Sequence, residues 1–263
     1  MVRQRKTTAA SQAAISTIVA ALEKRVAVIS DVHGNHHALD AVLAAVTADS
    51  PDEIWCLGDL VGYGPRPNEC CDGVAAGASL CLAGNHDLVV LATLDIADFA
   101  GDAAAAALWT RDVLSPESRA FLAGLQPSST ADGVALFHGS ARYPVWEYVL
   151  SEEAAWWTFE AVDQPLILVG HSHIPLAISY ADDALAGGLA EGGAEIELRG
   201  ARWLLNPGSV GQPRDGDPRA AYLLLEPGKA SFRRVEYPIP ATQAEMRAAG
   251  LPGPLAERLA FGR

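Results

Sequence analysis

The chain has 263 residues, 50% of them hydrophobic, and its formal net charge is −13. This length and composition allow one large core, so we expect a single folded domain rather than a disordered polypeptide. The acidic balance disfavours tight non-specific nucleic-acid binding, because that binding depends on Lys and Arg neutralising phosphates. No apolar run reaches about 18 residues, which excludes a membrane-spanning helix.

The first 24 residues allow two interpretations. Basic residues near the start precede a mildly apolar stretch from Ala13 to Leu22, which is the pattern of a signal peptide. However, the charged residues 23–25 lead directly into the first predicted strand and leave no room for a cleavage site. We therefore expect an N-terminal extension over 1–24 and the main folded domain over 25–240.

Five short apolar runs predict buried strands, and each ends in a block of polar residues. The runs are Val26–Ser30, Ile54–Leu57, Leu80–Ala83, Val134–Phe137 and Leu166–Val169. The blocks are Asp31-Val32-His33, Gly58-Asp59, Gly84-Asn85-His86-Asp87, His138-Gly139-Ser140 and Gly170-His171-Ser172-His173. The ends of neighbouring parallel strands lie along one edge of a sheet, so we expect these side chains to meet there.

In the segments between the predicted strands, apolar residues recur at helical spacing. This spacing predicts helices from Asn35 to Ala48 and from Asn68 to Gly77, which gives an α/β half-domain up to Ala83. Residues 88–125 are expected to form an all-helical insertion that either borders the active-site cleft or is an ordinary packing layer. Another helix is predicted from Ser151 to Ala161.

The C-terminal third is predicted to be rich in strands. We expect an antiparallel meander, forming a second sheet, from the segments Ala177–Tyr180, Glu195–Arg199, Arg202–Leu205, Ala220–Glu226 and Ser231–Glu236. The stretch from Gly187 to Gly193 is predicted to be a turn or mobile loop. Residues 241–263 are predicted to form a helical tail interrupted by Pro252 and Pro254.

The four cysteines are expected to be buried, reduced thiols. Cys56 and Cys81 lie in apolar strand-like runs, whereas Cys70 and Cys71 fall in a predicted helix. Reduced structural cysteines are typical of a cytoplasmic protein, and we expect that location.

The polar blocks contain the ligand types of a borderline divalent metal, namely carboxylate, amide oxygen and imidazole. Seven candidate ligands are present: Asp31, His33, Asp59, Asn85, His138, His171 and His173. One metal ion would leave most of them unused, whereas two ions about 3.5–4 Å apart, bridged by one carboxylate, would use them all. Mn²⁺, Fe²⁺, Ni²⁺ or Zn²⁺ would suit these ligands. An extended backbone at 171–173 would direct both histidines to the same side.

In order and spacing, these blocks resemble the calcineurin-like metallophosphoesterase superfamily, whose pattern is D-x-H, G-D, G-N-H-D, H and G-H-x-H. Residues 30–35, 58–65 and 206–214 also resemble the small bacterial and archaeal phosphodiesterase branch. The resemblance implies a four-layer α/β/β/α sandwich, in which two mixed β-sheets are flanked by helices.

The resemblance also implies a role for each residue of the blocks. The first metal would be bound by Asp31, His33 and His173. The second would be bound by Asn85, His138 and His171, with Asp59 bridging the two. His86 would face the phosphate and either protonate the leaving oxygen or stabilise the transition state. Four further residues are expected to contact substrate or to support the ligands: Asp87, Tyr63, Arg66 and Asn206.

Two features of the protein Ser/Thr phosphatases are not recognisable in this sequence. Those enzymes orient the catalytic His with an Asp, where this chain has Gly62, so Asp87 is the candidate to brace the site instead. Their pair of Arg residues that clamps a phosphomonoester has no evident counterpart. For Tyr63 and Arg66, the alternative is that they only belong to a Pro-shaped loop, and for Trp146 a packing role is favoured.

The expected function is metal-dependent hydrolysis of a phosphodiester or nucleotide-type substrate, in which a metal-bridging hydroxide attacks phosphorus. A phosphomonoesterase and a dinucleoside polyphosphate hydrolase are alternatives, because the metal chemistry is shared and specificity lies in loops. A protein-binding module on the same scaffold is a non-enzymatic alternative, against which the intact His86 counts. The sequence indicates no membrane partner and leaves a homo-oligomer open.

Overall fold

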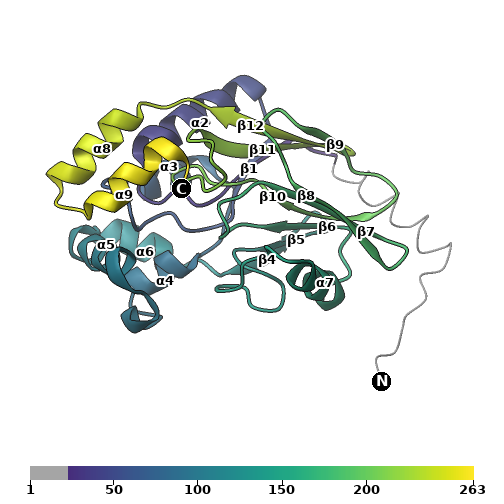
Figure 1. Cartoon of the computed structure of the whole chain (residues 1–263), viewed down its shortest axis with the longest axis horizontal. Helices are drawn as coiled ribbons and strands as arrows, with labels where there is room; N and C mark the ends of the chain where they lie inside the picture. The colour runs from purple at the N-terminus through teal and green to yellow at the C-terminus, as the bar shows by residue number, and fades with distance from the viewer. Residues whose placement is uncertain (1–22) are drawn as a thin grey trace.

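Residues 23–263 are described by a computed structural model, and within them two six-stranded sheets lie between layers of helices (Figure 1). The first sheet has the strand order β3-β2-β1-β11-β12-β9, and the second has the order β4-β5-β6-β10-β7-β8. This arrangement confirms the predicted α/β class with two mixed sheets. The expected extension over 1–24 lies almost entirely outside the described residues.

The first half of the chain builds the parallel part of the first sheet. Its elements are β1 (Val26–Ile29), α2 (His36–Asp49), β2 (Glu53–Cys56), α3 (Pro67–Gly77) and β3 (Leu80–Cys81). β1 and β2 pair in parallel, as do β2 and β3, because each crossover helix returns the chain to the same end of the sheet. The predicted helices and strands of this half are therefore confirmed.

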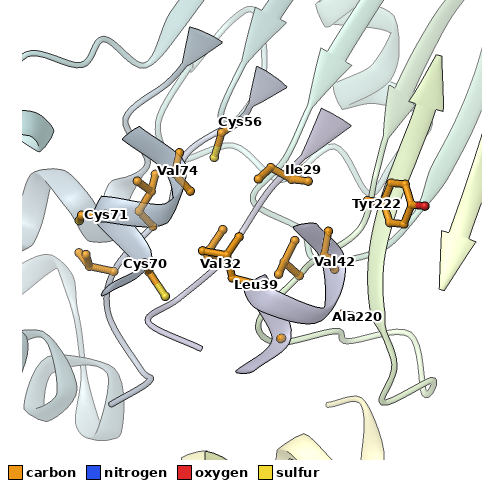
Figure 2. Close-up of a cluster of buried hydrophobic side chains, with 14 of the residues drawn as sticks. Ile29, Val32, Leu39, Val42, Cys56, Cys70, Cys71, Val74, Ala220 and Tyr222 are labelled. Carbon is orange, nitrogen blue, oxygen red and sulfur yellow. The ribbon is translucent and has the colours of Figure 1, made fainter. Parts of the chain in front are cut away.

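Helix α2 begins where its sequence predicts. The Asn35 side chain accepts a hydrogen bond from the amide of Ala38 and caps the first turn. Leu39, Val42 and Val46 recur at helical spacing and are buried against the first sheet. Figure 2 shows how this face meets Ile29, Val32 and Tyr222 in one hydrophobic cluster.

The second sheet combines strands from the middle and the C-terminal third. They are β4 (Ser128–Ala131), β5 (Val134–Phe137), β6 (Leu166–Val169), β7 (Leu176–Ala181), β8 (Ala184–Leu189) and β10 (Arg202–Asn206). β5 and β6 are parallel, and β10 joins β6 in parallel as well. Helix α7 (Glu152–Ala161) connects β5 to β6 and covers the outer face of this sheet (Figure 1).

The predicted antiparallel meander is wrong in its partners. Three of its strands, β9 (Glu195–Glu197), β11 (Ala220–Glu226) and β12 (Lys229–Val235), belong to the first sheet, where β11 pairs antiparallel with β1. β7 and β10 belong to the second sheet. The predicted Gly-rich loop is also wrong in part, because Gly187 and Gly188 lie within β8 and pair with β7.

The two sheets pack face to face through alternating residues. In β1, Val26 and Val28 face the core between the sheets, whereas Ala27 and Ile29 face the helices. Trp55 of β2 and Leu168 of β6 lie in the same central core. Because both faces of β1 are buried, its sequence is a continuous apolar run rather than an alternating one.

Helices close one end of the sandwich. α4 (Asn85–Val90), the short helix η1 (Ile96–Asp98), α5 (Gly101–Val113) and α6 (Pro116–Ala123) follow β3. The chain ends in α8 (Ile239–Ala248), α9 (Gly253–Glu257) and η2 (Arg258–Phe261), which lie beside α5 in Figure 1. Residues from α5, α8, α9 and η2 form one cluster with Tyr63, which follows β2.

Two further features concern the cysteines and the apolarity of the helices. The four cysteines are free; three are buried and Cys81 is partly buried. Among residues 23–263, no helix is long and apolar enough to cross a membrane.

Candidate metal centre

The candidate ligands follow five strands at one end of the two sheets; six lie in loops, and Asn85 is the first residue of α4. Those after β1, β2 and β3 come from the first sheet, and those after β5 and β6 come from the second. All are buried: Asp31, His33, Asp59, Asn85, His138, His171 and His173. Backbone hydrogen bonds hold neighbouring loops together; the amide of Asp31 donates to Gly58 O over 3.0 Å and that of Gly170 to His138 O over 2.9 Å.

A first group of ligand atoms forms around His33 and His173. Their Nε2 atoms are 3.0 Å apart. Oδ1 of Asp31 is 3.5 Å from Nε2 of His173, and Oδ2 of Asp59 is 3.6 Å from Nε2 of His33. Among the described residues, neither of these carboxylate oxygens has a hydrogen-bond partner. Four buried ligand atoms therefore converge on one position that could hold a metal ion.

A second group forms on the other side of Asp59. The same Oδ2 of Asp59 is 3.4 Å from Nε2 of His138. Oδ1 of Asn85 is 3.1 Å from that nitrogen, and the ring of His171 lies 4.9 Å from the ring of His138. Asp59, His138 and His171 could hold a metal ion together, so Asp59 belongs to both groups.

Backbone carbonyls fix which nitrogen each histidine turns toward these groups. A carbonyl oxygen only accepts, so Nδ1 must donate in His33 (to Val61 O, 3.1 Å), His173 (to Gln212 O, 2.6 Å) and His138 (to Leu57 O, 2.8 Å). In the neutral ring the opposite nitrogen then carries a lone pair directed into the group. His171 is reversed: its Nε2 faces Trp146 O at 3.2 Å, which leaves Nδ1 for the group. This second contact is how proteins orient metal-binding imidazoles.

The arrangement fits a bound cation. The Nε2 atoms of His33 and His173 are two acceptors facing each other, and the Asp31 and Asp59 oxygens beside them are unpartnered within the described structure. Such a cluster of buried lone pairs is costly unless a positive charge lies among them. Oxygen and nitrogen donors without thiolate suit a borderline divalent metal.

Burial favours the neutral form of three of the four histidines, and the Asp59 carboxylate favours the charged form of the fourth. Burial lowers the pKa values of His33 and His173 well below the usual range and that of His171 to about 3, so these rings are neutral and able to coordinate. Burial also lowers the pKa of His138, but the Asp59 carboxylate outweighs it and raises that pKa to about 9. A metal ion at this position would displace the His138 proton.

The loops reach this geometry through left-handed backbone. Asp31, His33, Asp59, His171 and His173 all have φ between 51° and 63°, a region that residues other than glycine rarely adopt. The expected extended backbone at 171–173 is therefore wrong, although His173 joins the first group and His171 the second, in the division that the family resemblance implies. Gly84 has a different role: a Cβ there would overlap Oδ1 of Asp59.

Comparison with known proteins assigns this centre to a family. A family model described as the calcineurin-like phosphoesterase superfamily domain matches residues 25–229. The chain belongs to the calcineurin-like phosphoesterase superfamily. The uncharacterized protein MJ0912 of Methanocaldococcus jannaschii is 37% identical over 249 residues, which are 92% of this chain and 100% of that protein. The chain is thus a phosphoesterase-family hydrolase with a cluster of metal-binding side chains.

Solved structures agree with this assignment. A crystal structure of a metallophosphoesterase from Sphaerobacter thermophilus has a TM-score of 0.83 and 42% identity, and the match covers 91% of this chain and 99% of that chain. The hypothetical protein PH1004 of Pyrococcus horikoshii OT3 has a TM-score of 0.72 over 91% of this chain and 98% of that one, but at 20% identity it shows only the shared fold.

A shorter stretch of the sequence is also similar to an enzyme with a named substrate. A symmetrical bis(5'-nucleosyl)-tetraphosphatase of Klebsiella pneumoniae is 48% identical over 67 residues, 24% of each chain.

In this phosphoesterase, the carboxylate of Asp87 holds backbone segments together and does not orient the His86 ring. Its carboxylate accepts hydrogen bonds from the amides of Gly84, Asp59, Leu60 and Val61 over 2.8–3.2 Å. These bonds tie the first turn of α4 to the loop after β2, so they fix the positions of Asn85 and Asp59 relative to each other.

Asn206 supports the loop after β6 in the expected way. Its Nδ2 donates to Gly170 O at 2.7 Å and to Ser172 Oγ at 3.0 Å. Its Oδ1 accepts from the amide of Gly208. The side chain therefore fixes both ends of the His171 turn without facing either ligand group.

The ring of His86 is held by packing, and a carboxylate accepts only from its backbone amide. Its ring contacts Tyr63 and Phe99 with centroids 4.3 and 4.5 Å apart, and its backbone amide donates to Oδ1 of Asp59. Nδ1 is buried against Gly62 without a hydrogen-bond partner in the described chain. Burial lowers the pKa of His86 to about 4, so the ring is neutral near pH 7.

A pocket of about 200 Å³ opens over both ligand groups. His86 and Tyr63 line it, together with residues that the sequence did not single out: Asp98, Phe99, Ala100, Ala103, Tyr148 and Arg214. Trp146 also lines it, although a packing role was favoured. Arg66 is instead bound to Glu69 and Glu245 by exposed ion pairs and, in the described structure, does not line this pocket; the expectation that it contacts substrate is not supported.

Arg214 is the residue that sequence analysis overlooked. Among the described residues that line the pocket, it is the sole Lys or Arg. Its amide donates to His173 O and its Nη2 to Oε1 of Gln212, so the side chain is anchored beside the first group. The signal available in the sequence was its place at the end of the family-like segment 206–214.

Proposed function

We propose that the chain is a two-metal phosphodiesterase. One observation carries this proposal: ring nitrogens of four histidines and two unpartnered carboxylate oxygens converge on two positions that share Asp59. Two divalent ions with one bridging carboxylate would satisfy every one of these atoms. A single ion at either position would leave the other set of buried acceptors without a partner.

The residues divide between the two ions as their distances suggest. Asp31, His33 and His173 would hold the first, with Asp59 bridging. The second would be held by Asn85, His138 and His171. Bound metals in such a site lower the pKa of a water nucleophile and neutralise charge on the phosphorus-bound oxygens.

The pocket side chains act on the substrate itself. His86 is neutral and lines the pocket, so it faces a phosphate above the ligand groups and assists departure of the leaving oxygen. Arg214 presents a guanidinium that donates to a non-bridging phosphate oxygen. Tyr63 and Phe99 keep the His86 ring in place by contact on either side.

The charges that line the pocket favour a diester over a monoester. A monoester carries an additional negative charge that needs a second cation, whereas Arg214 is the lone pocket Lys or Arg in the described structure. The carboxylate of Asp98 lies in the same pocket and would repel a dianion. Gly62 also stands where the protein phosphatases carry an Asp.

Hydrolysis of two chromogenic esters tests this preference. With Mn²⁺ or Ni²⁺ bound, we expect kcat/KM for bis(p-nitrophenyl) phosphate to exceed that for p-nitrophenyl phosphate at least about tenfold, or ~1.4 kcal/mol of transition-state binding. A clear preference for the monoester would reject the diesterase and leave the metal chemistry standing. Dinucleoside polyphosphates belong in the same panel, because the Klebsiella pneumoniae relative is a bis(5'-nucleosyl)-tetraphosphatase.

A further inference from the structure

We propose that the pocket contains a nucleobase-binding subsite formed by the rings of Phe99, Trp146 and Tyr148. This inference rests on the phosphodiesterase function proposed above and adds that the preferred ester carries a nucleoside. All three rings line the pocket, and Trp146 and Tyr148 are 39% and 44% exposed. Large aromatic rings gathered at the mouth of a polar site mark a ligand with a flat apolar surface.

The rings lead outward from the reacting position. Phe99 packs on His86 with centroids 4.5 Å apart, and Trp146 meets Phe99 edge to face at 6.0 Å and 81°. A phosphate facing His86 would therefore have an ester substituent beside Phe99 and directed toward Trp146. The ring of Trp146 keeps exposed surface on which a base can stack.

The loop that carries Trp146 and Tyr148 is tied to the metal centre. Nε2 of His171 donates to the carbonyl of Trp146, and the ring of Tyr148 stacks on that of His171 at 4.0 Å and an interplanar angle of 1°. Glu147, between them, pairs with Arg142 and accepts from Ser140 Oγ. The rings are thus preorganised, and a ligand would not need to order them on binding.

Polar groups in the pocket distinguish a nucleoside from a simple aryl group. Asp98 lies beside Phe99 and presents an exposed carboxylate that can accept hydrogen bonds from ribose hydroxyls or base amino groups. Arg214 provides the cation for the phosphate. An anion site, hydroxyl acceptors and aromatic rings in one pocket match the three parts of a nucleotide. Stacking on aromatic rings accepts any base, so the class of substrate is nucleoside esters in general.

Calorimetry on the Mn²⁺-loaded, full-length protein tests the subsite. Ribose 5-phosphate has a hydroxyl where adenosine 5'-monophosphate has the base, so the ratio of their Kd values measures the contribution of the base. We expect the adenosine compound to bind at least about tenfold more tightly. Trp146→Ala should weaken it about 5- to 150-fold, the range of base–aromatic stacking, and leave ribose 5-phosphate unchanged. Trp146→Phe should retain most of the preference.

Trp157→Ala is the matched control. The exposed fraction of Trp157 is 41%, similar to the 39% of Trp146. However, Trp157 lies on α7 and is not among the described residues that line the pocket. The Trp157→Ala variant should bind both compounds with the affinities of the wild type. Equal affinity of the wild type for the two compounds, or equal losses in the two Trp→Ala variants, would overturn the subsite. Hydrolysis of bis(p-nitrophenyl) phosphate by the same preparation separates the two proposals, because turnover without base preference rejects only the subsite.

Discussion

The side chains that approach the metal positions are held on strained backbone. Asp31, His33, Asp59, His171 and His173 each adopt a left-handed conformation, at a cost of about 1–3 kcal/mol per residue. Hydrogen bonds from their neighbours hold this geometry; for example, Ser209 Oγ donates to Asp31 O and the amide of His33 to Asp59 O. These five are among eleven non-glycine residues with positive φ in the described chain, so the ligand loops carry a large share of the left-handed backbone.

His86 should affect turnover and not metal binding. His86→Ala removes the neutral imidazole that lines the pocket and that we propose faces the substrate, so we expect kcat to fall about 10²–10⁴-fold, the range for a positioned acid–base group. The metal content by elemental analysis should stay at the wild-type value, because His86 belongs to neither ligand group. Loss of metal together with activity would show that His86 is itself a ligand.

Asp59 and His173 should differ in how many ions they hold. Asp59→Asn removes the charge shared by both groups and should weaken both sites together. His173→Ala should empty mainly the first site, because His138 and His171 remain. Titration of metal-free protein with Mn²⁺, followed by calorimetry, gives the number and affinity of sites. Loss of one independent site in each variant would contradict the bridge.

Residue identity was the part of the site that the sequence could predict. The His, Asp and Asn residues at strand ends could be recognised as candidate ligands because they fall in short sequence motifs. Arg214, Phe99 and Trp146 could not be assigned in this way, since they reach the pocket from three separate loops or helices. The left-handed backbone was likewise not predicted, because the sequence blocks show no turn signal at Asp31, His33 or His171 and their conformation depends on contacts between loops that are distant in sequence.

At the scale of elements, strands and helices with local signals were predictable and their partners were not. β5 and β6 were identified from their apolar runs, and α2 from the helical spacing of its apolar residues. The partner of β11 is set by a contact across the whole chain, where Leu223 faces Val28 of β1. Proximity in sequence suggested a meander, but burial of both faces of β11 places that strand inside the first sheet.

The loop after β2 offers a test of how His86 is positioned. Gly62 has φ +84°, and a Cβ there would overlap Nδ1 of His86. Gly62→Ala should therefore displace the His86 ring and lower kcat at least about tenfold with unchanged metal content. Gly133→Ala is the control: Gly133 has φ +76° in the turn between β4 and β5, with open space around its Cβ position.

Both Gly→Ala variants should lose about 1–2 kcal/mol of folding stability, because a side chain is disfavoured in left-handed backbone. Only Gly62→Ala should lose turnover. Urea unfolding and steady-state kinetics on the same two preparations measure both quantities. Equal activity in the two variants would show that contact with Gly62 does not position His86.

In the whole molecule, the two candidate ligand groups lie where the two sheets meet. Asp31, Asp59 and Asn85 follow strands of the first sheet, whereas His138 and His171 follow strands of the second. Each ligand group draws on both sheets, so bound metal would join the two layers in addition to the hydrophobic core between them. The pocket lies over this junction, bordered by Ala103 of α5 and by the loop after β5.

Anomalous diffraction from crystals loaded with Mn²⁺, together with elemental analysis of the same protein, tests the two-metal centre most directly. We expect close to two ions per chain and two anomalous peaks about 3.5–4 Å apart. One should lie beside His33 and His173 and the other beside His138 and His171, with Asp59 between them. A single ordered peak in fully loaded crystals, or peaks that Asp59 does not join, would contradict the dinuclear centre.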